Sequence, residues 1–318
     1  MVSLPTGQTG KAPRRLIVVG GPTASGKTRI AAELAGQFGT EVISADARQF
    51  YRAMPIGTGQ PTEAEKLGVP HHFIGHLEVE QAMSAQEYAH AALPVIDRLL
   101  SEHGVAVLAG GSFLYVDAVC FEFDALPPAD KALRERLQRT HGEQGIRALQ
   151  EELHRLDEAM WHRIDRQNPH RLIRAIEVCL LTGGKVSELH RGKRPRPGFE
   201  TTFIALSVDR NTLYRNIEAR VDDMVARGVV EEARALFPKR HLNALQTVGY
   251  KELFLHFDRP SPPLPAGDGV TLEESITLMK QHTRNYAKRQ MTWLRRDAHW
   301  QCVDPTDAKA IQRASGAH

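Results

Sequence analysis

The chain has 318 residues, of which 42% are apolar and 25% are charged, a composition typical of a soluble enzyme. Its length allows one large α/β domain and a smaller lobe, or two domains. The net charge of +3 is too small to point to a partner, and Cys120, Cys179 and Cys302 lie too far apart for a Cys-x-x-Cys zinc motif or a disulfide framework. The sequence has neither a stretch as apolar as a membrane helix nor an apolar signal core near residue 1, so we expect a cytoplasmic protein that does not enter membranes.

Short apolar strands alternate with helices along much of the chain. After a polar tail at residues 1–13, we expect strands at 16–20, 41–44, 105–109 and 203–208, and helices at 28–38 and 86–103. All-apolar strands separated by helices indicate an α/β fold, with a mostly parallel sheet flanked by helices on both faces.

The strand pattern disappears between residues 124 and 183, where Leu, Arg and Glu recur at helical spacing. This predicts an all-helical lobe, residues 125–183, inserted between two parts of an α/β core at 14–124 and 184–318. In the second part we expect helices at 211–237 and 272–296, and the four prolines between residues 258 and 269 indicate a loop.

The most informative motif follows the first strand and reads Gly21-Pro22-Thr23-Ala24-Ser25-Gly26-Lys27-Thr28, which is G-x-x-x-x-G-K-T between a strand and a helix. The glycines allow backbone N–H groups to turn toward an anion, and the positive end of the helix dipole adds to the attraction. We therefore expect this loop to bind a diphosphate or triphosphate, with Lys27 on the terminal phosphates and the Thr28 hydroxyl on Mg²⁺. The alternative is a tight strand-to-helix turn without a ligand.

Polar residues also follow two later strands, at the edge of the sheet where open α/β folds bind ligands. Asp46 comes after the second strand, and a carboxylate there can hold a metal, accept a proton or cap the next helix. The third strand runs into Gly110, Gly111 and Ser112 where a Walker-B strand has an aspartate, which argues against an ordinary ATPase or GTPase. The two glycines would allow a ligand to approach the backbone, and a simple turn is the alternative.

Basic residues gather in two places in the second half of the chain. On the last long helix Lys280, Arg284 and Lys288 recur every four residues and form one cationic ridge, and a second cluster lies at residues 190–196. Two such clusters on a nearly neutral chain are expected where a protein binds a nucleic acid backbone, the alternative being a solvated basic helix.

Two further arginine positions are ambiguous from the residues alone. Arg171 and Arg174 share one face of a helix, where a solvated or ion-paired role is as reasonable as a binding role. Arg220 borders an apolar stripe, and there the alternative to a functional role is a surface salt bridge.

Taken together, these stretches resemble the tRNA dimethylallyltransferase family in its bacterial form. The matching segments are GPTASGKT (21–28), ISADARQFY (43–51), VPHH (69–72), GGSFLY (110–115), NPHRLIRAIEV (168–178), IEARVDDM (217–224), VGYKE (248–252) and YAKRQMTWLR (286–295). They occur in order over nearly the whole chain, which makes the combination far more specific than the phosphate loop alone.

The resemblance implies a P-loop core with a helical insertion, and transfer of a dimethylallyl group from dimethylallyl diphosphate to the exocyclic N6 amine of the adenine next to the tRNA anticodon. It implies that Asp46 is the general base, that Ser112 hydrogen-bonds the acceptor amine, and that Arg220 stabilises the departing diphosphate together with the phosphate loop. Because no γ-phosphoryl group is transferred in such a reaction, the missing Walker-B aspartate agrees with it.

The resemblance also implies which residues touch tRNA: Asp46, Ala47, Arg48, Gln49, Ser112, Arg134, Gln167, Asn168, Pro169, His170 and Arg171, to which the basic ridge adds Arg284 and Lys288. Ala47 departs from the pattern, since most members have serine there. We expect Mg²⁺ as cofactor, the tRNA anticodon stem-loop and dimethylallyl diphosphate as partners, and a monomer. The alternatives are an adenylate isopentenyltransferase acting on free adenine nucleotides, a P-loop small-molecule kinase, and a non-catalytic RNA-binding protein.

Overall fold

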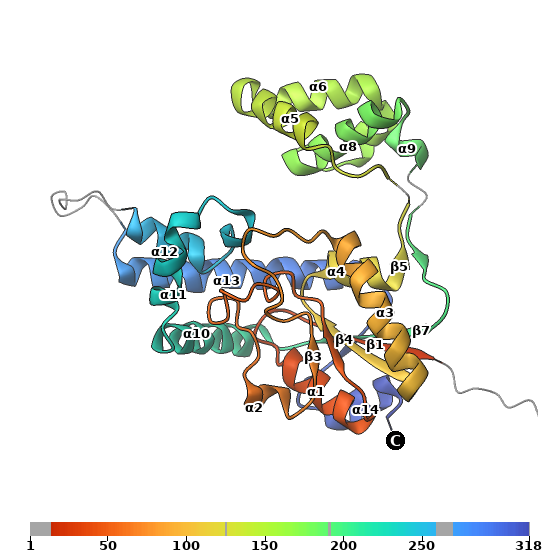
Figure 1. Ribbon diagram of the computed structural model, residues 1–318, viewed down its shortest axis with the longest axis vertical. Helices are drawn as coiled ribbons and strands as arrows, with labels where there is room; N and C mark the ends of the chain where they lie inside the picture. The colour runs from red at the N-terminus through yellow and green to blue at the C-terminus, as the bar shows by residue number, and fades with distance from the viewer. Residues whose placement is uncertain (1–13, 125, 190–191, 259–269, 318) are drawn as a thin grey trace, which may run out of the picture. The chain divides into compact units, whose positions relative to one another are not determined.

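The computed structural model describes residues 14–124, 126–189, 192–258 and 270–317 (Figure 1). The chain divides into two compact units: the first joins the residues up to Cys120 to those from Arg196 onward, and the second is Phe121–Pro195. The polar tail expected at 1–13, most of the proline-rich loop, and residues 190 and 191 of the second basic cluster lie outside the described residues.

The first unit is built on a six-stranded parallel sheet with the strand order β3-β2-β4-β1-β7-β8. The strands are β1 (Arg15–Gly20), β2 (Val42–Ser44), β3 (His71–His72), β4 (Val105–Gly110), β7 (Glu200–Leu206) and β8 (Trp300–Val303). In β1, Val18 pairs with Leu108 of β4 on one side and with Phe203 of β7 on the other. Residues 16–19 have no exposed surface, as expected for a strand covered on both faces.

Helices connect these strands, as parallel pairing requires. In the first unit they are α1 (Lys27–Gln37), α2 (Glu63–Lys66), α3 (Ala85–His103), α4 (Phe113–Cys120), α10 (Arg210–Ala226), α11 (Val229–Leu236), α12 (Tyr250–Phe257), α13 (Leu272–Leu294) and α14 (Ala308–Ser315), with 3₁₀ turns at Phe237–Lys239 and Asn243–Leu245. The predicted fold class, a mostly parallel sheet flanked by helices, is confirmed. Among the described residues, no helix is long and apolar enough to cross a membrane.

The helix expected at 211–237 is in fact two helices, α10 and α11. Gly228 separates them with a φ of 97°, a left-handed conformation that side chains with a Cβ rarely adopt. The break turns α11 out of line with α10, so that α11 packs on α12 and on the segment that follows β2.

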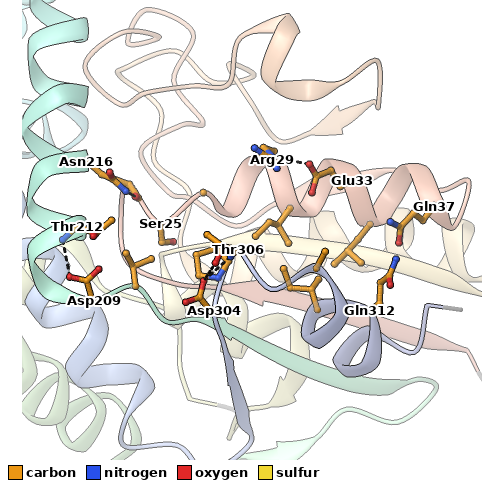
Figure 2. Close-up of a pocket in the computed structure, with 18 residues that line it drawn as sticks. Ser25, Arg29, Glu33, Gln37, Asp209, Thr212, Asn216, Asp304, Thr306 and Gln312 are labelled. Atoms are coloured by element: carbon orange, nitrogen blue, oxygen red, sulfur yellow. Dashed lines mark hydrogen bonds and ion pairs between the residues drawn. The ribbon is translucent and has the colours of Figure 1, made fainter.

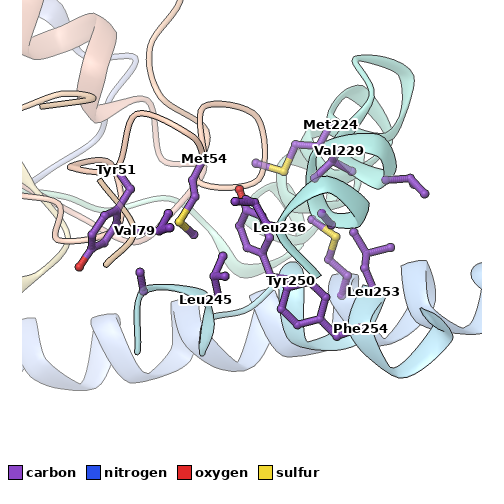
Figure 3. Close-up of a cluster of buried hydrophobic side chains, with 14 of the residues drawn as sticks. Tyr51, Met54, Val79, Met224, Val229, Leu236, Leu245, Tyr250, Leu253 and Phe254 are labelled. Atoms are coloured by element: carbon purple, nitrogen blue, oxygen red, sulfur yellow. The ribbon is translucent and has the colours of Figure 1, made fainter. Parts of the chain in front are cut away.

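A cluster of buried side chains joins this helical layer to the segment that follows β2 (Figure 3). Tyr51 and Met54 of that segment share the cluster with Leu236 of α11 and with Tyr250 and Leu253 of α12. The segment that carries Asp46 at its start is therefore packed into a core a few residues after Asp46.

Glu232 of α11 adds a polar attachment to the same segment. Its carboxylate accepts hydrogen bonds of 2.8 Å from the backbone N–H groups of Ile56 and Gly57, and one of 2.6 Å from the Tyr250 hydroxyl. Such charge-assisted bonds are the strong ones, and they restrict the segment between β2 and β3.

The second unit is helical, with α5 (Lys131–Gln144), α6 (Ile146–Leu156), α7 (Glu158–Arg163), α8 (Pro169–Thr182) and α9 (Val186–Leu189), and one antiparallel pair, β5 (Phe121–Glu122) with β6 (Arg194–Pro195). It extends beyond the expected 125–183 at both ends, because β5 and β6 pair with each other and Val186 of α9 belongs to the apolar cluster of α5, α6 and α8.

Candidate active site

The carboxyl ends of β1, β2 and β4 bring three of the predicted segments together at one edge of the sheet. A small cavity there is lined by Lys27, Thr28, Ser44, Asp46, Gln49 and Gly110, among others. The phosphate loop and Asp46, which the sequence places near each other only by topology, thus face the same space.

Lys27 is the cation of this cavity. Its amine donates a 2.7 Å hydrogen bond to the Pro22 carbonyl, so the side chain folds back over its own loop. Burial lowers the pKa of Lys27 to about 8, the Asp46 carboxylate acts in the opposite direction, and Arg220 acts in the same direction as burial. The three charges therefore lie within electrostatic range of one another.

Asp46 begins a turn at residues 46–49, and no helix starts there, so the alternative of a helix cap is wrong. One carboxylate oxygen, Oδ1, accepts a 3.1 Å hydrogen bond from the Arg48 N–H. The carboxylate lines the cavity beside Lys27, where it can accept a proton or face a cation.

Arg220 of α10 does not form a surface salt bridge. Its guanidinium donates a 3.1 Å hydrogen bond to the Gly59 carbonyl, and burial lowers its pKa while the charge of Asp46 opposes that change. Arg220 and Lys27 are thus two cations close to one carboxylate, an arrangement suited to an anionic ligand.

Ser112 is fixed beside the Asp46 turn by hydrogen bonds on both sides of it. Its hydroxyl accepts a 3.0 Å bond from the Ala47 N–H, and its own N–H donates a 3.3 Å bond to the Ala45 carbonyl. We expected Gly110 and Gly111 to let a ligand approach the backbone, but in the structure protein atoms lie beside them. A Cβ on Gly110 would overlap the Ala45 backbone, and a Cβ on Gly111 would overlap the Gln290 amide.

A larger cavity, of about 770 Å³, borders the same phosphate loop at Ala24, Ser25 and Gly26 (Figure 2). Its other walls come from α1, the start of α10 and α14, and the carboxylates of Asp209 and Asp304 line it. Lys27 and Asp46 line the smaller cavity and not this one, so we place the chemistry at the smaller cavity.

Comparison with known proteins identifies the family. The family model described as IPP transferase matches residues 49–297. A tRNA dimethylallyltransferase of Christiangramia forsetii is 43% identical over 89% of this chain and 90% of its own length. The chain belongs to the IPP transferase family.

Solved structures of this family have the same fold. The tRNA isopentenylpyrophosphate transferase of Bacillus halodurans is 34% identical, with a TM-score of 0.67 and 95% of each chain covered. The corresponding transferase of Staphylococcus epidermidis is 29% identical, with a TM-score of 0.64 and coverage of 95% of this chain and 97% of the other.

The side chains of Arg48 and Gln49, which we expected to contact tRNA, bind neighbouring segments of the protein. Arg48 donates to the Asn243 and Ala244 carbonyls at 2.9 and 3.2 Å, and Gln49 donates to the Gly59 carbonyl at 2.9 Å. These bonds hold the Asp46 turn in place, and contact with tRNA stays a prediction.

The remaining contacts expected from the resemblance lie in the second unit. Arg134 donates two hydrogen bonds, of 2.9 and 3.0 Å, to Glu177, a carboxylate with no exposed surface. Asn168 caps α8 by accepting the Arg171 N–H, Pro169 occupies the first turn, and His170 and Arg171 are exposed, as is Gln167. The RNA contacts of these residues stay predictions.

The cationic ridge of α13 is largely neutralised. Lys280 forms a 2.6 Å ion pair with Asp222, and Arg284 forms one of 2.8 Å with Glu218, both on α10. These ion pairs reduce the positive charge of the ridge at Lys280 and Arg284, because α10 places acidic side chains beside them. The contact of Arg284 with tRNA stays a prediction. Lys288 is exposed, and its role in binding tRNA stays a prediction.

Three residues near the site could not be assigned a role from the sequence. Gln290 and Tyr286 look like members of the apolar stripe of α13, yet Gln290 bonds the phosphate loop, and burial and the charge of Asp46 raise the pKa of Tyr286. His71 lines the cavity and belongs to the VPHH segment. Its Nδ1 faces the Val69 carbonyl at 2.9 Å and must carry the proton, which leaves Nε2, buried and without a partner among the described residues, as an acceptor.

Proposed function

We propose that this protein is a tRNA dimethylallyltransferase, which transfers the dimethylallyl group of dimethylallyl diphosphate to the exocyclic N6 amine of the adenine next to the anticodon. The observation that carries the proposal is the meeting of Lys27, Asp46 and Arg220 at the end of a sheet whose β4 strand lacks a terminal carboxylate. Two cations suit a diphosphate, and a single carboxylate suits removal of one proton. The names of the relatives support the same reaction.

The phosphate loop would bind the leaving group. N–H groups at the start of α1, the Lys27 amine and the Arg220 guanidinium can stabilise the negative charge that grows on the diphosphate as the carbon–oxygen bond breaks. Thr23 is not an available donor in this arrangement, because its N–H bonds Gln290.

We propose Mg²⁺ as the metal of this site. The Thr28 hydroxyl is an oxygen donor on the wall of the cavity, and Mg²⁺ prefers oxygen ligands that include substrate phosphates and water. When bound, the ion would neutralise part of the charge of the diphosphate.

Asp46 and Ser112 would act on the acceptor. As the adenine nitrogen forms a bond to C1 of the dimethylallyl group, the C1–O bond breaks and its electron pair leaves with the diphosphate. The proton of the amine passes to Asp46, while Ser112 orients the amine from beside the turn. The adenine must leave the anticodon-loop stack first, which costs a few kcal/mol.

We also propose that one chain suffices for the reaction and that it acts in the cytoplasm, where tRNA is modified. Lys27, Asp46, Ser112 and Arg220 all belong to the first unit of a single chain, so the chemistry needs no residue from a second copy.

The test is incubation of the purified protein with radiolabelled dimethylallyl diphosphate, Mg²⁺ and unmodified tRNA, followed by nucleoside analysis. Parallel reactions contain AMP in place of tRNA, or a tRNA in which guanine replaces the target adenine. We expect labelled N6-dimethylallyl adenosine only with the unmodified tRNA. Label on AMP alone would favour the adenylate isopentenyltransferase alternative, and no label on any acceptor would refute the proposal.

A further inference from the structure

The amide of Gln290 joins two loops of the active site that are far apart in sequence. Gln290 lies on α13 and is only 5% exposed. Its Oε1 accepts a 2.8 Å hydrogen bond from the Thr23 N–H of the phosphate loop, and its Nε2 donates a 3.0 Å bond to the Gly111 carbonyl after β4. The two partners fix the orientation of the amide, because a carbonyl can only accept and an N–H can only donate.

The connection continues from Gly111 to both sides of Asp46. The next residue, Ser112, donates its N–H to the Ala45 carbonyl and accepts the Ala47 N–H at its hydroxyl. A short series of hydrogen bonds thus runs from the phosphate loop through Gln290 and the turn at residues 111 and 112 to the backbone that flanks Asp46.

The two glycines of this turn allow the close approach of Gln290 and of the Asp46 segment. A Cβ on Gly111 would overlap the Gln290 Nε2, and a Cβ on Gly110 would overlap the Ala45 carbonyl. One helical turn earlier, Tyr286 presents its phenol to Asp46 and Ser112 from the same face of α13. This face of α13 therefore contacts both the diphosphate side and the acceptor side of the site.

We propose that Gln290 is a positioning residue that sets the separation between the phosphate loop and Asp46. The inference rests on the proposed function, in which the carbon of a loop-bound diphosphate ester must lie within about 3–3.5 Å of an amine held by Asp46. A displacement of about 1 Å between the two sides can cost on the order of 100-fold in rate. At neutral pH a primary amide offers both the acceptor for Thr23 and the donor for Gly111, whereas an ionised carboxylate of the same size can only accept.

Three variants of the full-length protein test the inference. Gln290→Met keeps the length of the side chain and removes both hydrogen bonds. Gln290→Glu keeps an acceptor for Thr23 and, when ionised, lacks the donor for Gly111. Gln281→Met is the matched control, because Gln281 is an exposed residue of the same helix that touches none of these loops.

We expect the single-turnover rate of prenyl transfer to fall roughly 10- to 100-fold in Gln290→Met, with the Kd for tRNA within about twofold of wild type. In Gln290→Glu the rate should recover toward pH 5.5, because a protonated carboxyl regains the donor, whereas Gln290→Met shows no such recovery. Gln281→Met should behave as wild type. A role in folding alone would lower Tm and would not produce the acid recovery.

Hydrogen–deuterium exchange provides a readout that does not depend on catalysis. In Gln290→Met, peptides covering residues 21–28 and 43–51 should both exchange faster than in wild type. Unchanged exchange in either peptide, or a transfer rate within threefold of wild type, would overturn the inference. If wild type itself transfers no prenyl group while exchange changes as expected, the proposed function is what fails.

Discussion

Replacing Asp46 with asparagine removes the predicted proton acceptor while preserving the turn around it. The amide oxygen of the new side chain can still accept the 3.1 Å hydrogen bond from the Arg48 N–H, so the local backbone should not change. Among the described residues, no other carboxylate lines the small cavity. No second carboxylate there can therefore accept the proton in place of Asp46. We expect the rate of prenyl transfer to fall by about 10²–10⁴, the usual contribution of one general base, with the loss near the upper end. This corresponds to about 3–5 kcal/mol in the barrier.

The assay must separate loss of the base from a change in Lys27. Because the charge of Asp46 raises the pKa of Lys27, the substitution lets that pKa fall below about 8, and at alkaline pH the variant would also bind diphosphate less well. Single-turnover transfer is therefore measured at pH 7 or below, with saturating dimethylallyl diphosphate, and tRNA binding is measured separately. Asp297→Asn is the matched control, since Asp297 also accepts the N–H two residues ahead and lines neither cavity.

We expect a large loss of rate in Asp46→Asn, with tRNA affinity within about twofold of wild type and a normal rate in Asp297→Asn. A single-turnover rate within threefold of wild type in Asp46→Asn would refute the role of general base.

Three further measurements test other parts of the structure. Only the protonated Lys27 amine attracts diphosphate, and its pKa is about 8, so the affinity for dimethylallyl diphosphate should be constant below pH 7 and fall as the pH rises through 8 to 9. Lys27→Arg should not show this fall. A wild-type affinity that does not change with pH would contradict the role of Lys27. Lys288→Gln should reduce the salt dependence of tRNA binding by about one counterion, as expected for the loss of one phosphate contact. Arg284→Gln should reduce it less, because Arg284 is already paired with Glu218. Equal reductions would show that this ion pair opens when tRNA binds. Glu177→Ala should destabilise the second unit by about 1–3 kcal/mol, because Arg134, Arg174 and the Asp130 N–H lose their shared acceptor. Amide hydrogen exchange in α5 and α8 measures this loss. Unchanged exchange would mean that water replaces the carboxylate without cost.

Much of the fold follows from local sequence patterns, and the exceptions have physical reasons. The strands β1, β2, β4 and β7 are apolar runs between helices, and the sequence predicts each of them within a few residues. β3 has only two residues, and in β8 the first and last residues are buried while the two between them are exposed. Both edge strands therefore lack the continuous apolar run that marks a strand covered on both faces.

Some residues of the candidate site can also be recognised from the sequence, and others cannot. The phosphate loop and Asp46 are recognisable because each follows a strand in a known spacing, and the structure places them on one cavity. Gln290 could not be recognised, because a glutamine inside an amphipathic stripe looks like ordinary packing until its two partners are known. The basic residues of the α13 ridge are visible in the sequence, but their neutralisation by Glu218 and Asp222 depends on the packing of α10 against α13.

The position of the second unit within the chain has a consequence during synthesis. β1 needs β7 as one of its two neighbours, and β7 begins at Glu200, after residues 121–195 have all been made. At about 5–20 residues per second, the ribosome leaves one edge of β1 without its neighbour for on the order of ten seconds or more. During that interval the nascent sheet exposes an apolar strand edge of the kind that promotes aggregation and attracts chaperones. The helical unit, whose apolar cluster comes from its own residues, can meanwhile fold first.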